Sequence, residues 1–305
     1  MWAKKNNIGA PICRLCSAAD CSSLGMIPDS DMFAGRIIET PLFGGQLWHC
    51  QDCDSQFRYP ILVESGYLKL YQAVETDIWE NSLVRKDQKM MIAALQREVL
   101  GGSVLDVGCF AGQLLATLPQ TYKTYGLEPS QAAARIASTK GVQILGATVD
   151  DIAPDAQFDC IVSMDVMEHV LDPAQFLEKA LRHIKPGGFL FFSTGNPDSL
   201  AWRYVFKSRF WYVSNAEHVS FPSQKWIAEK TKTLGAEVVA IANFRYADIG
   251  LKRTLVKLFG QILYGVSPKF YATWRGKQID GSEFPSVYSF GVFKDHHLIT
   301  IRKSH

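Results

Sequence analysis

Short apolar runs alternate with amphipathic stretches along the chain from about residue 100 onward. The apolar runs predict strands at 103–107, 122–127, 142–145, 158–163, 188–193, 236–242 and 297–302. The amphipathic stretches have apolar residues at helical spacing and predict helices at 112–118, 130–139, 173–184 and 223–234. Strands that alternate with helices are typical of a mostly parallel sheet covered on both faces. The pattern therefore predicts the α/β fold class, as a doubly wound, seven-stranded, mostly parallel sheet.

The chain divides into three parts on this pattern. Residues 1–60 are rich in turns, residues 61–100 show helical spacing, and residues 101–305 carry the alternating pattern. We therefore expect a small N-terminal subdomain, a helical linker that also covers the ligand site, and a main domain. Residues 195–222 and 244–295 interrupt the alternation and are rich in aromatic side chains. Long insertions of this kind are often lids or substrate walls, and we expect that role here.

The composition sets limits without pointing to a partner. Of the 305 residues, 47% are hydrophobic and 20% are charged, which is ordinary for a globular protein. The formal net charge is +2 with acids and bases intermixed, so no electrostatic footprint for nucleic acid stands out. The N-terminus lacks the apolar run of a signal peptide, and no stretch approaches the roughly 18 apolar residues of a membrane span. We expect a cytoplasmic protein.

Two C-x-x-C units stand out among the seven cysteines. They are Cys13-Arg14-Leu15-Cys16 and Cys50-Gln51-Asp52-Cys53, separated by 33 residues. In a reducing compartment, paired cysteines are more often metal ligands than disulfides. Two such turns complete a tetrahedron of thiolates for zinc and leave no open position for catalysis. We therefore predict a structural zinc site made by Cys13, Cys16, Cys50 and Cys53, with Cys21 and His49 as lower-ranked ligands and free cysteines as the alternative.

The first strand of the main domain runs into a glycine turn, Val104-Leu105-Asp106-Val107-Gly108-Cys109-Phe110-Ala111-Gly112. In open α/β sheets, ligands bind beyond the carboxyl ends of strands, where strand order reverses. Glycines such as Gly108 and Gly112 let the backbone approach a ligand closely. Asp106 at the strand end suits a cationic or zwitterionic ligand better than a pyrophosphate. Cys109 and Phe110 lie in the same turn and are expected at the ligand, although burial of a small residue also explains Cys109.

The next strand ends supply further candidates for the same ligand. Glu128 closes the second strand, 22 residues after Asp106, where a carboxylate can accept both ribose hydroxyls of an adenosine. Val149 and Asp150 follow the third strand and suit the apolar face and the polar edge of adenine. Met164 ends the fourth strand as either a cofactor contact or a core methionine.

Four segments, in this order and spacing, resemble the class I S-adenosylmethionine-dependent methyltransferases. They are VLDVGCFAGQLL, YGLEPS, FDCIVSMDVMEHVLDP and IKPGGFLFFSTGNP. The resemblance covers about residues 85–240 and implies a Rossmann-like domain that binds S-adenosylmethionine. Within the family, the ubiquinone-biosynthesis O-methyltransferases are the most similar in the MEHV and FFST segments. The family usually has glycine where Phe110 stands. Phenylalanine does not freely take a positive φ, so we expect a variant loop or a ring turned toward the substrate.

A zinc knuckle ahead of such a domain resembles the deoxysugar C-methyltransferases of antibiotic pathways. Some ribosomal RNA methyltransferases also carry a knuckle, with different spacing. The resemblance implies a small-molecule acceptor, methylated on a hydroxyl or a carbon, with RNA as the alternative acceptor. A non-catalytic adapter that keeps the fold is a further alternative. A nicotinamide oxidoreductase is disfavoured because the G-x-G-x-x-G pattern is absent.

A hydroxyl or carbon acceptor needs a general base. His218, in the insertion after the fifth strand, is the first candidate, and His169, in the loop after the fourth strand, is the second. His169 otherwise orients its loop or contacts the cofactor, and His218 is otherwise a structural residue of the insertion. The aromatic residues at 202–212 either wall an apolar or sugar substrate or pack the insertion itself. The amphipathic stretch at 251–263 has a basic edge and either packs on its own domain or makes peripheral contact with a membrane.

Overall fold

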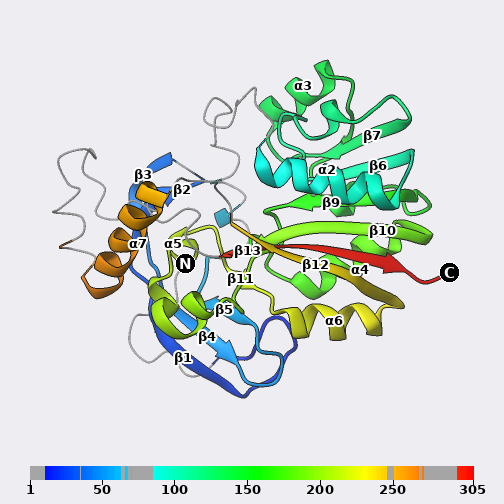
Figure 1. Cartoon of the computed structure of the whole chain (residues 1–305). Coiled ribbons are helices and arrows are strands. Elements are labelled where there is room, and N and C mark those ends of the chain that lie inside the picture. The colour runs from blue at the N-terminus through cyan, green and yellow to red at the C-terminus, as the bar shows by residue number, and fades with distance from the viewer. Residues whose placement is uncertain are drawn as a thin grey trace. The chain divides into compact units, whose positions relative to one another are not determined.

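The computed structural model describes residues 11–34, 36–62, 66–67, 70, 85–245, 251–267, 270 and 294–305. The chain forms two compact units (Figure 1). The first, here called the cysteine unit, consists of Met1–Leu70, Gly195–Trp226 and Asn243–His296. The second, here called the sheet unit, consists of Tyr71–Thr194, Ile227–Ala242 and His297–His305. The domain boundaries predicted from the sequence, at residues 60 and 100, stay predictions.

The sheet unit is built on a seven-stranded sheet with the order β12-β13-β10-β9-β6-β7-β8, which confirms the predicted fold class. Its strands are β6 (Gly102–Val107), β7 (Tyr122–Leu127), β8 (Gln143–Gly146), β9 (Phe158–Met164), β10 (Ile184–Gly195), β12 (Ala236–Phe244) and β13 (His296–Lys303). Strands β8, β7, β6, β9 and β10 pair in parallel. The chain runs from β6 outward to β8 and then returns to β9 on the other side of β6. Strand order therefore reverses between β6 and β9, where ligands bind in open α/β sheets.

Helices accompany this sheet as α2 (Lys86–Glu98), α3 (Gln131–Thr139), α4 (Pro173–Arg182) and α6 (Gln224–Thr233). Helix α4 begins where the sequence predicts, because the Asp172 carboxylate accepts a hydrogen bond from Gln175 N and Pro173 occupies the first turn. The capping oxygen satisfies an amide that has no partner within the helix, and proline has no amide to leave unpaired. The apolar face of α4 is buried and consists of Phe176, Leu177, Ala180 and Leu181.

The helix predicted at 112–118 is wrong. The segment makes a turn and a single 3₁₀ element, η2 (Leu115–Thr117). Gly112 has a φ of +72°, which no right-handed helix adopts. A Cβ on Gly112 would lie 3.1 Å from the Cβ of Ala137 in α3, so the glycine permits close packing of the turn against that helix. This packing explains why the apolar periodicity of the segment does not give a helix.

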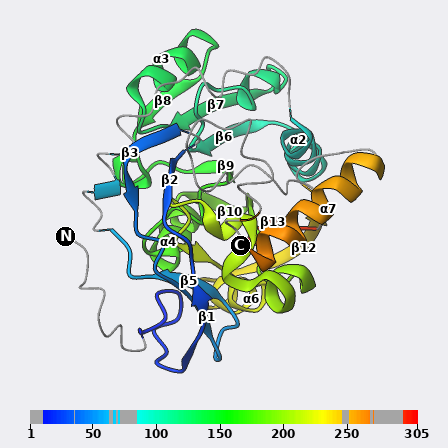
Figure 2. The ribbon, with the colours of Figure 1, turned by 90° about the vertical axis from the view of Figure 1, so that its left-hand side faces the viewer.

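The cysteine unit contains strands where the sequence predicts mainly turns. They are β1 (Cys21–Met26), β2 (Ser30–Phe33), β3 (Arg36–Leu42), β4 (Gln46–Cys50) and β5 (Gln56–Tyr59). A distant strand, β11 (Ser220–Phe221), completes a four-stranded sheet with the order β1-β4-β5-β11. Strands β2 and β3 form a separate two-stranded sheet (Figure 2). Because β11 pairs antiparallel with β5, segment 195–226 is built into the same unit as the N-terminal strands.

An aromatic core fills the cysteine unit. It brings N-terminal residues together with the aromatic segment around η4 (Ala201–Phe206), η5 (Lys207–Arg209) and α5 (Trp211–Ser214). Its buried members are Ile27, Leu47, Trp202, Phe206, Phe210, Trp211, Tyr212, Val213 and Phe221. Trp202 is fully buried and stacks on Phe210 with a centroid distance of 4.8 Å. The aromatic residues of this segment therefore mostly pack the unit itself, and only Tyr204 among those at 202–212 is exposed.

A sixteen-residue helix, α7 (Leu251–Val266), covers the amphipathic stretch predicted at 251–263. Several of its apolar side chains are at least 47% exposed, namely Leu255, Val256, Phe259, Ile262 and Val266. Within the described part of the chain, no helix combines the length and the apolar character needed to cross a membrane.

Candidate cofactor and metal sites

The carboxyl ends of β6, β7 and β9 lie side by side in the sheet unit. Val107 at the end of β6 is paired with Leu127 of β7 and with Ser163 of β9. The chain neighbours of these three residues include Asp106, Glu128 and Met164, which the sequence predicts at the cofactor. The sheet therefore gathers these three residues at one edge, next to the point where strand order reverses.

Asp106 is a buried carboxylate, and one of its two oxygen atoms lacks a hydrogen-bond donor among the described residues. Its residue is 4% exposed, and its Oδ1 has no hydrogen-bond partner among the described residues. Burial raises the pKa of Asp106 well above its usual range, and the charge of Glu128 adds to this rise. An unsatisfied buried acceptor costs about 1–3 kcal/mol, and more when it is charged. A cationic group of a bound ligand would satisfy this oxygen, which fits the zwitterionic ligand predicted for this position.

The glycine turn after β6 is held by hydrogen bonds to the end of β7. Gly108 N donates to Leu127 O at 2.9 Å, and Gly108 has a φ of +77°. A Cβ on Gly108 would lie 2.6 Å from Cγ2 of Val166, so a side chain here requires a neighbour to move. The bare backbone of Gly108 is thus a structural requirement of the turn as well as a surface that a ligand can approach.

Phe110 corrects one prediction. Its φ is +47°, so it adopts the left-handed conformation that the sequence led us to expect it to avoid. Such a conformation costs a non-glycine residue roughly 1–2 kcal/mol. Phe110 N donates a hydrogen bond to Glu128 Oε2 at 2.9 Å, and a bond to an ionised acceptor offsets this cost. The turn therefore keeps a positive φ at this position without glycine.

Glu128 shapes the turn and also offers acceptors to a ligand. Besides the bond from Phe110 to Oε2, Ser130 N donates to Oε1 at 2.8 Å. Each carboxylate oxygen has two lone-pair directions, so one remains on each oxygen for a hydroxyl group. Burial raises the pKa of Glu128, and the two backbone hydrogen bonds act in the opposite direction. This arrangement fits a carboxylate that accepts the two hydroxyls of a ribose.

The predicted adenine contacts stay predictions. Val149 and Asp150 lie in the short element η3 (Val149–Asp151). Asp150 is exposed and forms an ion pair with Lys179. Asp151 instead accepts two backbone amide hydrogen bonds of 2.8 Å, which lower the pKa of its carboxyl. Asp151 is thus the residue that shapes the loop, and Asp150 is the one with its carboxylate at the surface.

Of three further predicted contacts, Cys109 and Gly112 have structural roles in this unit. Cys109 is buried, its N donates to Leu127 O, and burial raises the pKa of its thiol. Gly112 packs against α3. Met164 is half-buried at the end of β9. Their contact with a cofactor stays a prediction.

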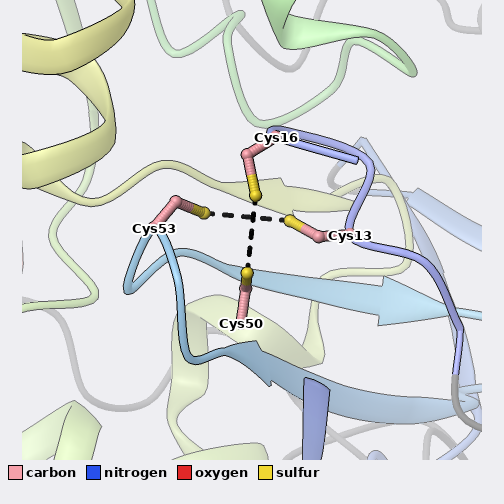
Figure 3. Close-up of side chains that lie close together, drawn as sticks. All are labelled: Cys13, Cys16, Cys50 and Cys53. Atoms are coloured by element: carbon pink, nitrogen blue, oxygen red, sulfur yellow. Dashed lines mark hydrogen bonds between the residues drawn. The ribbon is translucent and has the colours of Figure 1, made fainter. Parts of the chain in front are cut away.

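Four cysteine side chains of the cysteine unit converge on one point (Figure 3). They are Cys13, Cys16, Cys50 and Cys53, and their sulfur atoms all lie within 4.8 Å of one another. The Sγ atoms of Cys13 and Cys53 are 3.8 Å apart, and those of Cys16 and Cys50 are 3.5 Å apart. A tetrahedral zinc ion with Zn–S bonds of about 2.3 Å has sulfur atoms about 3.8 Å apart. The two separations given are close to this value, so the four predicted ligands fit a zinc ion.

The two knuckles share one backbone geometry. Ser17 N donates to Cys13 O at 2.8 Å, and Asp54 N donates to Cys50 O at 3.0 Å. Both Ser17 and Asp54 have a positive φ, of 64° and 60°. Each C-x-x-C unit is thus a tight turn that closes on its own first cysteine, which directs both thiols to the same side. This equivalence supports a joint role for the two units.

The lower-ranked ligands lie outside the four-cysteine group. Cys21 is paired with Cys50 across strands β1 and β4, and its Sγ contacts Ala18 O. His49 Nε2 lies 3.2 Å from Asp54 Oδ1. Within the group, burial and the neighbouring thiols raise the pKa of Cys16 to about 12. Without a metal ion such clustered thiols stay protonated, whereas a bound metal ion would hold them in the thiolate form.

The two candidate bases belong to different units. His218 is buried in the cysteine unit, and its Nδ1 lies 2.8 Å from Tyr212 O. A backbone carbonyl only accepts, so a hydrogen bond between these two atoms requires the proton on Nδ1. In the sheet unit, His169 Nε2 lies 3.9 Å from Oε1 of the buried Glu168. The role of either histidine as a general base stays a prediction.

The sequence did not single out Arg58, a buried residue of β5 that the structure connects to the loop around His218. Its guanidinium donates to four backbone carbonyls. Three of these belong to residues between 213 and 218, about 155 or more positions along the chain. A lone arginine in a four-residue strand carries no sequence signal for partners that distant.

The seven-stranded sheet, with its strand order reversing between β6 and β9, has the fold of the class I S-adenosylmethionine-dependent methyltransferases. A family profile described as a methyltransferase domain matches residues 84–241, just over half of the chain. The chain belongs to this methyltransferase domain family.

Curated relatives point to the same family. The ubiquinone biosynthesis O-methyltransferase of Klebsiella pneumoniae subsp. pneumoniae is 36% identical over 120 residues, which is 36% of this chain and 50% of the relative. That of Erwinia tasmaniensis is 32% identical over 156 residues, which is 46% of this chain and 64% of the relative. The chain thus matches half to under two thirds of their length. A Thermotoga maritima structure, a possible histamine N-methyltransferase, has a TM-score of 0.46 at 18% identity and covers 72% of this chain and 89% of its own.

Proposed function

We propose that the chain transfers a methyl group from S-adenosylmethionine to a small metabolite, at a hydroxyl or an acidic carbon. The observation that carries this proposal is the buried Asp106, whose Oδ1 has no partner within the described residues. An adapter that merely keeps the fold has no use for a buried carboxylate that costs stability. A carboxylate of this kind suits the ammonium group of a bound S-adenosylmethionine.

The sheet unit would hold the cofactor by its two ends. S-adenosylmethionine, when bound, supplies a methyl group on a sulfonium for in-line displacement. Asp106 would bind the amino-acid end, and the lone pairs that remain on Glu128 would accept the ribose hydroxyls. The backbone at Gly108 allows close approach without a side chain. Holding both ends fixes the position of the reactive carbon, and such alignment is a large part of the catalysis of transfer reactions.

His218 is the general base in this proposal. Its Nδ1 proton is engaged by Tyr212 O, so Nε2 has the lone pair that takes the proton of the acceptor as the methyl group is transferred. A positioned base contributes roughly 10²–10⁴-fold to the rate. His169, beside Glu168, is the second candidate.

The four-cysteine site is proposed to hold structural zinc. A site with four thiolates is closed, so the ion has no open position for a substrate. Its ligands come from β4, the turn before β5 and the N-terminal loop. Zinc would therefore fasten the N-terminal strands of the cysteine unit and have no direct part in methyl transfer.

A small acceptor is favoured over RNA. Binding RNA requires several lysine and arginine side chains that reach phosphates. Near the knuckles, Arg58 is buried and occupied by carbonyl groups, so it is not available to a phosphate. The relatives named for ubiquinone biosynthesis and the resemblance to deoxysugar C-methyltransferases support a hydroxylated or sugar-like metabolite.

Peripheral contact with a membrane is proposed for α7. Its sequence has three basic residues and no acidic residue, and its exposed apolar residues include Leu255 and Ile262. Exposed apolar side chains combined with a net positive charge fit the surface of an anionic bilayer. This contact would bring the chain to an acceptor that carries a lipid tail.

The test is a methyl-transfer assay with labelled cofactor. A metabolite extract containing nucleotide sugars and quinone precursors, and separately total RNA, serve as acceptors. We expect label only in the metabolite fraction, strongly reduced by Asp106→Asn. The matched control, Asp155→Asn, alters an exposed aspartate of the same unit and should retain wild-type transfer.

His218→Ala and His169→Ala separate the two candidate bases in that assay. We expect His218→Ala to lower transfer roughly 10²-fold or more, and His169→Ala to have a smaller effect. Label entering only RNA would overturn the choice of acceptor, and lack of cofactor binding would favour the adapter.

A further inference from the structure

Arg58 is a buried cation in the cysteine unit, on strand β5. It is 2% exposed, which is rare for arginine. Burial lowers the pKa of Arg58, and the charge of the neighbouring Glu217 acts against this shift. An arginine nevertheless stays protonated in proteins, so a full positive charge lies inside the unit. Such a charge is tolerated only where its donors are well satisfied.

The donors of Arg58 are satisfied by backbone carbonyls. Nε donates to His218 O at 3.0 Å, and Nη1 donates to Gly44 O at 2.9 Å. Nη2 donates to Asn215 O at 2.8 Å and to Val213 O. Three of the four carbonyls thus belong to residues 213–218, which connect α5 with β11. The planar guanidinium fixes these three carbonyls in one geometry.

The ring of His218 depends on the same connection. Its Nδ1 contacts Tyr212 O at 2.8 Å, so the hydrogen bond that sets the tautomer spans the segment whose carbonyls Arg58 holds. The backbone N of Arg58 also donates to Val219 O at 2.9 Å, directly after His218. Contacts from one residue therefore fix the backbone on both sides of the histidine.

We propose that Arg58 is a positioning residue that fixes the tautomer and orientation of His218. The proposal rests on the proposed function only in giving His218 a catalytic task. Arg58 touches no reacting atom in this account. It acts by holding the 213–218 backbone, so that Nδ1 of His218 donates to Tyr212 O and Nε2 remains the basic nitrogen.

This role ties the four-cysteine site to the base. Strand β5 follows Cys53, and Ser223, beyond β11, donates to Cys53 O through its hydroxyl. Trp226 Nε1 donates to Leu15 O, inside the first knuckle, at 3.0 Å. Beyond the residues that Arg58 contacts, the segment that carries His218 is thus hydrogen-bonded to both knuckles.

The experiment reads the tautomer directly. The ring nitrogens of ¹⁵N-labelled histidine are observed by NMR in the zinc-loaded full chain, and His218→Ala assigns the signal. We expect the Nδ1-protonated tautomer in the wild type. In Arg58→Lys, a compact ammonium cannot reach carbonyls on four residues, and we expect a mixture of tautomers. Methyl transfer to the metabolite extract should fall roughly 10-fold or more, with zinc content unchanged.

The matched control is Arg203→Lys, which alters an arginine of the same unit that pairs with Asp54 at 2.7 Å. It should leave the tautomer and the transfer rate as in the wild type. Added guanidinium ion should partly restore the wild-type tautomer in Arg58→Ala, a result that a general loss of packing does not produce.

A folded Arg58→Lys chain with the wild-type tautomer would overturn the proposal. If the variant does not fold, the wild type is tested instead, by measuring scalar couplings across the hydrogen bonds from the Arg58 guanidinium to the carbonyls of Val213 and His218. The absence of these couplings would overturn the proposal. Full transfer by His218→Ala would instead refute the proposed base, and the tautomer measurement would still judge Arg58.

Discussion

The two units of the chain bring their proposed functional residues together in different ways. In the sheet unit, the proposed cofactor residues come from one continuous stretch, and parallel pairing of β6, β7 and β9 brings them together. In the cysteine unit, the four thiols and His218 come from segments far apart in the chain. Long-range hydrogen bonds such as those of Arg58 and Trp226 connect these segments.

This difference indicates where each unit is vulnerable. A parallel sheet with a buried apolar interior is stable without the groups at its edge, so a change at Asp106 or Glu128 should alter binding and not folding. The cysteine unit has short strands of two to seven residues and is assembled from three parts of the chain. It should therefore depend on its metal and on its buried polar contacts.

The largest expected effect is the loss of one thiol ligand. Cys13→Ser should lower metal content from about one zinc per chain to nearly none, and the cysteine unit should lose its cooperative thermal transition, because ligation free energies on the order of 10 kcal/mol are folding free energy. Elemental analysis and calorimetric melting measure both. Cys21→Ser, outside the four-cysteine group, is the control and should keep the metal. A fully folded Cys13→Ser chain with intact zinc would show that the thiols are not ligands.

A smaller effect is expected at the cofactor site of the sheet unit. Asp106→Asn should weaken binding of S-adenosylhomocysteine roughly 10–100-fold, because a charge-assisted hydrogen bond contributes about 1.5–3 kcal/mol. Its melting temperature should not fall, since the buried carboxylate lacks a partner for Oδ1 in the described part of the chain. Titration calorimetry with Asp155→Asn as the control measures the binding. Unchanged affinity would remove Asp106 from the site.

Binding should also depend on pH. Burial raises the pKa of Asp106 above its ordinary value of 3.8, and burial raises the pKa of Glu128 as well. Below the raised value Asp106 is neutral, and above it the carboxylate is charged and attracts an ammonium group. Affinity for S-adenosylhomocysteine should therefore still rise with pH above the ordinary range of an aspartate, by at most about tenfold per pH unit for one linked proton. Asp106→Asn should flatten this rise, and an equally steep rise in the variant would assign it to another group.

The smallest expected effect concerns α7. Leu255→Ser combined with Ile262→Ser should weaken binding to vesicles that contain anionic lipid by about fivefold, because side chains at a bilayer surface are only partly withdrawn from water and lose a fraction of the about 1.5–3 kcal/mol of full burial. Cosedimentation measures the bound fraction. Val239→Ser, an exposed apolar residue on β12, is the control. A wild-type chain that does not bind such vesicles would refute the membrane contact.

Local signals predicted the sheet unit well. Helix α4 carries its cap and its stop in adjacent residues, and the strand and glycine turn around Asp106 lie within a single motif. Backbone conformation at single positions was harder to foresee. The positive φ of Phe110 depends on a hydrogen bond to Glu128, 18 positions further on, and the turn at Gly112 depends on packing against α3.

In the cysteine unit, the sequence predicted the grouping of the four thiols but not the strands or the core. The C-x-x-C spacing identifies four ligands because the chemistry of zinc demands them. The core around Trp202 was not foreseen, because its partners Ile27 and Leu47 lie about 150 or more positions earlier. Arg58 was missed for the same reason, since its hydrogen bonds to residues 213–218 follow from tertiary structure and not from any local pattern.

We propose that the cofactor site belongs to the sheet unit alone and that the metal serves the cysteine unit. The most direct test is calorimetric titration of S-adenosylhomocysteine into the full chain before and after zinc is removed with a chelator. We predict that the dissociation constant changes by no more than about threefold, although the stripped chain loses the thermal transition of the cysteine unit. A loss of affinity as large as that caused by Asp106→Asn would contradict this division of tasks.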